Sequence, residues 1–255
     1  LARHWKRVLL LRTKVQSSRI SGSQKNQLTE LEVSLVIEDI GQSLMLSLKE
    51  NNFGETLASG ADVALSQLVD GPLKDIPVFG TLLKLAKTGI DVKNLLFANK
   101  VESFLYQLNE IPSDQRIEFT ESLKKKGMYE KVGANLVLLI ERVDDMDKTA
   151  IIGKFFAKWI EGKTDQDTFF RLANVVIRSY LADLRLLANN SNNPAPPNQW
   201  LNPIQEEALY NVGLLSVKLV GTTRVSHHGL SEEGIPKFKY YVSDLAMKLV
   251  ALGFD

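Results

Sequence analysis

Cysteine is missing from the sequence. Its absence excludes disulfides, thiolate zinc sites, iron–sulfur clusters and cysteine nucleophiles. It also permits a reducing compartment. The remaining composition is ordinary for a globular protein, with 44% hydrophobic and 24% charged residues among 255. A chain of this length can bury a substantial core without disulfides or metals.

Long apolar runs are also missing, because no 18 consecutive residues are apolar. The sequence therefore predicts no transmembrane helix. Residues 76–97 come nearest, but Lys84, Lys87, Asp91 and Lys93 interrupt them. We interpret this segment as a core helix with lysines on its outer face. The alternative is an amphipathic helix whose lysines face anionic headgroups at a membrane surface.

Acidic residues are absent from positions 1–27, which carry seven basic residues: Arg3, Lys6, Arg7, Arg12, Lys14, Arg19 and Lys25. We interpret this stretch as a basic, disordered N-terminal arm or as residues upstream of the natural start. The alternatives are an organelle presequence and a basic helix on a membrane surface. Since the whole chain has 31 basic and 30 acidic residues, the rest has 24 and 30, a net charge of −6. A mildly acidic body is unusual for a nucleic-acid binder.

Apolar residues recur at helical spacing from residue 28 to residue 188. The pattern predicts helices at 28–49, 56–69, 81–109, 114–126, 129–142, 148–161 and 165–188. Residues 189–199, rich in Asn, Pro and Ser, predict a linker. Beyond it we expect a helix at 203–212, strands at 217–225 and 237–242, and a helix from 243 to 252. The predicted fold is mainly α, with a helical bundle domain at 28–188 followed by a small α+β unit at 200–255.

The C-terminal unit carries a recognisable order of elements. Residues 208–215 read Ala-Leu-Tyr-Asn-Val-Gly-Leu-Leu, two predicted strands follow, and residues 241–246 read Tyr-Val-Ser-Asp-Leu-Ala. This order resembles the end of winged-helix domains, in which a helix ends in a Gly-Leu-Leu step and two strands form the wing. The resemblance implies a winged-helix-like unit that binds DNA. The sequence departs from that family because the linker separates 203–212 from the preceding helices, unless 167–188 supplies one.

A second resemblance concerns residues 60–185. Residues 74–80 read Lys-Asp-Ile-Pro-Val-Phe-Gly and precede a long amphipathic segment. This arrangement resembles uncharacterised bacterial and prophage-associated helical proteins. The resemblance implies a bacterial cytoplasm, and it implies no activity.

One acidic cluster has the composition of a metal site. Glu141, Asp144, Asp145 and Asp147 lie within seven residues, and carboxylates suit Mg²⁺ or Ca²⁺. The cluster lacks the central Gly and the closing Glu of an EF-hand loop. We therefore interpret it as helix capping.

The two adjacent histidines, His227 and His228, lie near Glu232 and Glu233. Neighbours on a strand point to opposite faces, which disfavours a shared metal. Ser226, His228 and Asp244 could form a hydrolytic triad, but no nucleophile elbow accompanies them. No glycine-rich phosphate loop occurs either. We therefore predict no catalytic residue, no metal ligand and no cofactor.

The predicted helix at 203–212 carries Glu206 and Glu207 and no Lys or Arg. DNA phosphates would repel this helix, so we predict that it does not bind duplex DNA. The predicted hairpin is a better candidate, because it is basic and carries neighbouring tyrosines. Its candidate nucleic-acid contacts are Lys218, Arg224, Lys237 and Lys239. The alternative is a solvated strand face.

Together these patterns predict a non-enzymatic, intracellular interaction or sensing protein, and the second resemblance implies a bacterial or prophage type. Its partner would be another protein or a second copy of the chain. The first alternative is a DNA-binding transcriptional regulator that uses the basic wing. The second is a peripheral membrane-associated effector that uses residues 76–97.

Overall fold

Residues 22–50, 57, 71–86, 92–223 and 235–254 are described by a computed structural model of the chain. The chain divides into two compact units, Leu1–Lys163 and Thr164–Asp255. The fold class predicted from the sequence, a mainly α domain followed by a small α+β unit, is confirmed. The described strands form one antiparallel pair and both belong to the second unit.

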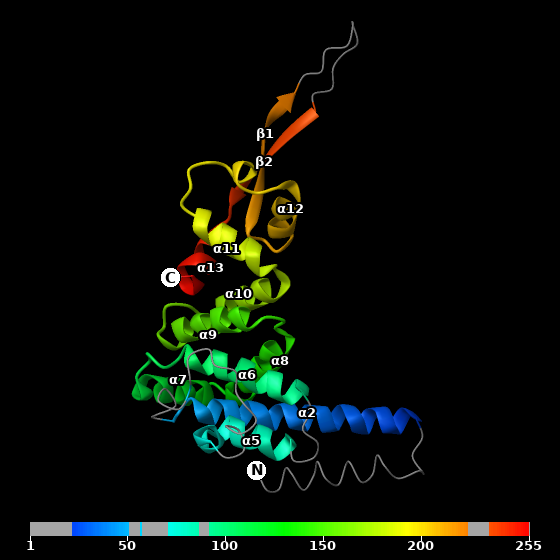
Figure 1. The fold of residues 1–255 in the computed structure, drawn as a ribbon, viewed down its shortest axis with the longest axis vertical. Helices are drawn as coiled ribbons and strands as arrows, with labels where there is room; N and C mark the ends of the chain where they lie inside the picture. Colours follow the sequence, from blue (N-terminus) through cyan, green and yellow to red (C-terminus); the bar gives the residue numbers. More distant parts are fainter. Residues whose placement is uncertain (1–21, 51–56, 58–70, 87–91, 224–234, 255) are drawn as a thin grey trace, which may run out of the picture. The chain divides into compact units, whose positions relative to one another are not determined.

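The first unit is helical throughout its described part (Figure 1). Within it, α2 packs against α5 and α8, and α6 packs against α9. Its elements are α2 (Gly22–Ser47), η1 (Pro72–Asp75), α5 (Pro77–Ala86), α6 (Val92–Tyr106), α7 (Ser113–Lys125), α8 (Tyr129–Arg142) and α9 (Met146–Ile160).

Aromatic rings fill the core between α6, α7 and α9. Phe156 lies 5.3 Å from Phe104 and 5.6 Å from both Phe119 and Trp159, measured between ring centroids. Three of the ring pairs in this cluster are edge-to-face, an arrangement that stabilises beyond buried area alone. Phe104 and Phe156 are fully buried. This cluster fixes α9 against α6.

A second close contact joins α2 to α8 through glycine. A Cβ added at Gly41 would lie 2.7 Å from the backbone of Gly133 and Ala134. A Cβ added at Gly133 would lie 2.7 Å from the carbonyl oxygen of Gly41. The two helix backbones therefore touch, and larger residues would push them apart.

Arg116 of α7 joins three segments of the first unit. Its Nε donates to the carbonyl of Leu48 at 3.0 Å, and Nη1 donates to those of Leu108 and Ile111 at 3.2 and 2.9 Å. Its Nη2 donates to the carbonyl of Glu50 at 2.6 Å. Only 3% of Arg116 is exposed. The guanidinium thus satisfies carbonyls at the end of α2 and in the turn after α6.

The described part of the second unit contains three α-helices and a short 3-10 helix, followed by a hairpin and a final α-helix. Its elements are α10 (Gln166–Arg178), α11 (Leu181–Asn190), η2 (Pro197–Gln199), α12 (Pro203–Asn211), β1 (Leu215–Thr223), β2 (Ile235–Val242) and α13 (Asp244–Gly253). Asp165 caps α10, and Asn202 forms a capping box with Gln205 at α12. Ser243 caps α13 and also donates to the carbonyl of Gly213 at 2.8 Å. These caps confirm the helix starts that the sequence predicts here.

The predicted boundary between the two parts of the chain differs from the observed one. The chain divides between Lys163 and Thr164, so the segment 189–199 lies inside the second unit. Pro197 is buried, and η2 contacts both α12 and β2. Trp200 donates to the carbonyl of Ala195 at 3.2 Å. The segment therefore packs against the second unit at Pro197, while Asn192, Asn193, Pro194, Asn198 and Gln199 are exposed.

Several predicted helix limits are also corrected. The helix predicted from residue 28 begins at Gly22, so it includes the end of the basic stretch. Within the helix predicted at 81–109, the structure describes α5 and α6, and residues 87–91 between them lie outside the described residues. The helix α5 begins at Pro77, because proline is tolerated at the first helical position, and α6 ends at Tyr106. The helix predicted at 165–188 is interrupted at Ser179, which is extended. Residues 1–21 and the predicted helix at 56–69 lie outside the described residues, apart from Leu57.

Candidate functional site

The β1–β2 hairpin presents two chemically different faces. Val217 pairs with Tyr240 and Leu219 with Phe238, so these four side chains share one face, called here the apolar face. Ser216 pairs with Tyr241 and Lys218 with Lys239 on the other, called here the basic face. A bulge between Leu219 and Gly221 ends the regular alternation.

The apolar face is uncovered toward its outer end. Leu219 is 60% exposed and Phe238, directly opposite it, is 62% exposed. At the base of the hairpin, Leu215 is buried. Between these ends, the ring of Tyr240 lies 5.6 Å from the ring of Tyr210 on α12. The hairpin is thus anchored at its base and exposes large apolar side chains beyond it.

The basic face brings two positive charges together. Lys218 and Lys239 are exposed and lie opposite each other, a placement that destabilises a strand pair. The ammonium of Lys218 lies 5.2 Å from the ring centroid of Tyr241, a cation–π distance. The described residues of both strands include no Asp or Glu. This face would therefore attract negatively charged groups.

Of the four predicted nucleic-acid contacts, Lys218 and Lys239 are brought together. The backbone of Lys237 pairs with Gly221, and its side chain lies outside what the structure describes. Arg224 lies outside the described residues, as do Ser226, His227 and His228. The exposed apolar pair Leu219 and Phe238 was missed by the sequence analysis. The alternation of Val217, Lys218 and Leu219 was the available signal, since it predicts an apolar face opposite the lysines.

The two glutamates of α12 differ in their exposure to solvent. Glu207 is exposed, whereas the Oε1 atom of Glu206 is buried without a hydrogen-bond partner among the described residues. Burial raises the pKa of Glu206. The helix also exposes Ile204 and Tyr210. Its surface is therefore acidic and apolar, as its sequence indicates.

The acidic cluster before α9 provides the N-cap of that helix. The side chain of Asp145 accepts a hydrogen bond from the backbone of Asp147 at 2.8 Å. Asp144 pairs with Lys148 at 2.7 Å, and this bond lowers the pKa of Asp144. The capping interpretation is confirmed for Asp145. Within the described ranges, no group of three or more His, Asp or Glu residues could hold a metal ion.

The first half of the segment 76–97 belongs to the hydrophobic core. Val78 and Phe79 are fully buried and Leu82 is 7% exposed, in the helix α5 that packs against α2. Lys84 is exposed, while the side chains of Lys87 and Lys93 lie outside the described part. Among the helices that the structure describes, none has the length and apolar character needed to cross a membrane.

Comparison of the chain with protein-family models, with curated proteins and with solved structures finds no match. The resemblances to winged-helix domains and to prophage-associated proteins therefore stay predictions.

Proposed function

We propose that this chain is a non-enzymatic cytoplasmic protein that binds a protein partner through the apolar face of its C-terminal hairpin. The observation that carries the proposal is the cross-strand pair of Leu219 and Phe238, each more than half exposed. Aromatic and large aliphatic side chains grouped on a surface are typical of protein interfaces.

The energetics of the hairpin support this proposal. A two-stranded hairpin without further cover is only marginally stable in water. Covering a Leu or Phe side chain contributes about 1.5–3 kcal/mol. A partner bound on the apolar face would therefore gain binding free energy and also stabilise the hairpin. Leu219 and Phe238 would then form the centre of the interface.

The charge of the hairpin indicates the chemistry of the partner. Lys218 and Lys239 place positive charge on the basic face, on the other side of the strands from the apolar face, and have no acidic neighbour on the described strands. A partner that covers the apolar face with apolar side chains and reaches the basic face with acidic ones would complement both faces. A second copy of the hairpin has no acidic residue on its described strands, so it could cover the apolar face but would not complement the basic face.

The proposal is tested by capture with a matched control. Leu219→Ser with Phe238→Ser removes the apolar pair, and Leu31→Ser removes a comparable side chain, 56% exposed, from α2. We expect one protein from the source organism to be retained by the parent and by Leu31→Ser, and lost from the double variant. If the double variant retains the same proteins as the parent, the hairpin does not bind the partner.

A second function is favoured by the basic face. Lys218, Lys239 and Tyr241 combine positive charge with an aromatic ring, the elements of single-stranded nucleic-acid binding. In this alternative the hairpin is the basic wing of a winged-helix-like regulator. Lys218→Glu with Lys239→Glu would then abolish binding to an oligonucleotide, and the parent would lose affinity steeply between about 50 and 200 mM salt.

A further inference from the structure

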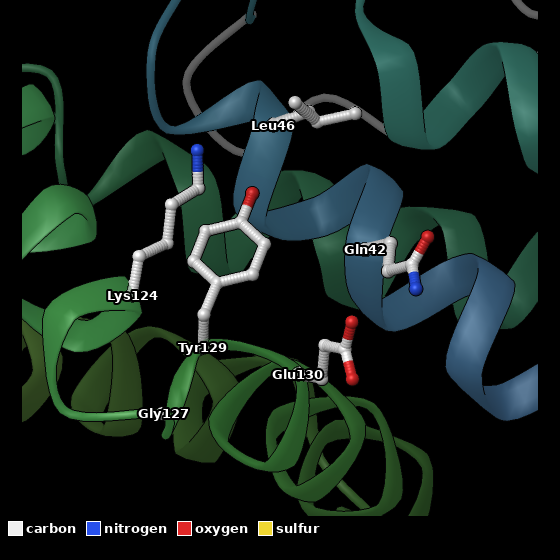
Figure 2. A pocket seen from close by; sticks show the side chains of 6 residues that line it. All are labelled: Gln42, Leu46, Lys124, Gly127, Tyr129 and Glu130. Carbon is white, nitrogen blue, oxygen red and sulfur yellow. The ribbon is translucent and has the colours of Figure 1, made fainter.

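A pocket of about 540 Å³ lies in the first unit, between α2 and the turn that joins α7 to α8 (Figure 2). Its volume is in the range of small-molecule sites. It is lined by Gln42, Leu46, Lys124, Gly127, Tyr129 and Glu130. None of these residues takes part in the hairpin surface described above.

The local sequence explains how the pocket forms. Gly127 ends α7 with a φ of +67°, a left-handed conformation that glycine adopts readily. The backbone bonds from Gly127 to Lys124 and from Met128 to Leu123 close a Schellman motif, and α8 starts at Tyr129 directly afterwards. The contact of Gly41 with Gly133 holds α2 against α8. The chain is thus folded sharply at one wall of the pocket.

One side of the pocket offers hydrogen-bond donors. The hydroxyl oxygen of Tyr129 is buried, with no partner among the described residues. A buried hydroxyl without a partner costs about 1–3 kcal/mol. Because solvent does not reach this oxygen, a ligand would accept from it, and recover that cost, after the Tyr129 side chain turns toward the pocket that it lines. Burial also raises the pKa of Tyr129, which keeps its hydroxyl protonated as a donor at neutral pH.

Positive charge accompanies this hydroxyl. The ammonium of Lys124 lies 5.1 Å from the ring centroid of Tyr129. Lys124 and Lys49 both bind the carboxylate of Glu121, which leaves one net positive charge in this group. The N-cap position of α8, Met128, makes no side-chain capping bond, and a helix N-terminus favours a nearby anion. This side is therefore suited to a carboxylate.

The other side offers acceptors. In Figure 2 the carboxylate of Glu130 and the amide of Gln42 lie on the opposite side of the pocket from Lys124. A carboxylate favours a protonated amine, and the amide oxygen can accept a second hydrogen bond from it. Leu46 adds an apolar wall. A purely anionic ligand would be repelled by Glu130.

We infer that this pocket binds a small zwitterion, with its carboxylate at Lys124 and the Tyr129 hydroxyl and its protonated amine at Glu130 and Gln42. Free amino acids have this chemistry. The inference is independent of the hairpin, and it would give the chain a sensing site in its first unit.

The test is thermal unfolding of the full chain with each standard amino acid in turn. Acetate and methylammonium serve as the two separated halves of the ligand. We expect at least one amino acid to raise the melting temperature, and neither half alone to match it. If no amino acid raises it, or if acetate raises it as much, the inference is overturned.

Substitutions of the lining residues test whether the amino acid binds in this pocket. Tyr129→Phe keeps the ring and removes the hydroxyl, and Glu130→Gln removes the charge that holds the amine. Each should weaken binding at least about tenfold, the effect of losing one hydrogen bond to a charged group. Tyr180→Phe, a change at an exposed tyrosine of the second unit, should leave the binding unchanged. Equal affinity in Tyr129→Phe and the parent would overturn the inference.

Lys124→Met provides an independent variant should Tyr129→Phe fail to fold. The side chain of Lys124 is 44% exposed, so its replacement perturbs the core little. We expect it to weaken amino-acid binding at least about tenfold as well. Unchanged affinity in this variant would remove Lys124 from the site and contradict the assigned orientation.

Discussion

Lys218 and Lys239 lie directly opposite each other on β1 and β2, where like charges destabilise the strand pair. Lys218 is partly compensated by the ring of Tyr241, at 5.2 Å. No acidic side chain of the described strands compensates either lysine. The hairpin thus retains a repulsive pair that a negatively charged partner would relieve.

Replacing one of these lysines should stabilise the free protein. Lys239→Glu places opposite charges across the strands, and we expect the free energy of unfolding to rise by about 0.5 kcal/mol in urea. Lys239→Gln is the matched control and should give a smaller gain. Salt at about 1 M should remove the difference between the two variants. A loss of stability in Lys239→Glu would contradict the repulsion.

The contact between α2 and α8 makes Gly133 intolerant of a side chain. A methyl group there would lie 2.7 Å from the carbonyl oxygen of Gly41, so Gly133→Ala should lower the free energy of unfolding by about 3 kcal/mol. Gly127→Ala is the comparison, because its Cβ meets nothing within 4 Å and only its left-handed φ opposes it. It should cost about 1 kcal/mol.

Helix propensity alone makes the opposite prediction for Gly133. Alanine is the better helix former by roughly 1 kcal/mol in an open helix position. If urea unfolding shows Gly133→Ala to be as stable as the parent, the two helices do not approach as closely as described.

Even the conservative replacement of Arg116 by lysine should lower the stability of the protein. The carbonyls of Leu48, Ile111 and Glu50 each accept from a different guanidinium nitrogen, and the single ammonium of a lysine cannot occupy all three positions. We expect Arg116→Lys to lower the free energy of unfolding by about 3 kcal/mol, since buried carbonyls lose their donors. Arg142→Lys, at an exposed position of α8, should change it by less than about 0.5 kcal/mol. Similar stabilities for the two variants would contradict this role.

The ion pair at the start of α9 should make stability depend on pH. Lys148 is 4% exposed, and its hydrogen bond lowers the pKa of Asp144 below the ordinary value for Asp of about 4. The charged carboxylate therefore favours the folded state. Its contribution is complete above about pH 4 and is lost as the pH falls through the lowered pKa.

Asp144→Asn should consequently reduce stability at pH 7 and much less near pH 3. Because the Asp144 side chain is 70% exposed, we expect only about 1 kcal/mol at pH 7. Glu141→Gln, at an exposed position of α8, is the control and should show no such pH dependence. The measurement is urea unfolding at both pH values. An equal loss at both would show that charge is not the cause.

Local signals predict helices well where they are strong. The helix predicted at 129–142 is observed with the same limits, and α7 ends before Gly127 as predicted. In both cases a glycine turn and a dense apolar pattern act within a few residues. The N-caps Asp165, Asn202 and Ser243 are local signals of the same kind.

Tertiary packing decides what the sequence patterns could not. The Asn- and Pro-rich segment at 189–199 has the composition of a linker, but the buried Pro197 and the contacts of η2 hold it inside the second unit. The same holds for the surfaces. Alternation predicts that Leu219 shares a face with Val217, but not that this face is exposed. The pocket at Tyr129 depends on the contact of Gly41 with Gly133, which are far apart in the sequence.

The central claim is that Leu219 and Phe238 bind the protein partner, and its most direct test is calorimetric titration of the captured partner. Leu219→Ser with Phe238→Ser should weaken binding by about a hundredfold or more, as expected for paired residues at the centre of an interface. Urea unfolding of this variant should stay within about 0.5 kcal/mol of the parent, because both side chains are exposed. Leu31→Ser should bind as the parent does. Parent-like affinity in the double variant would contradict the account.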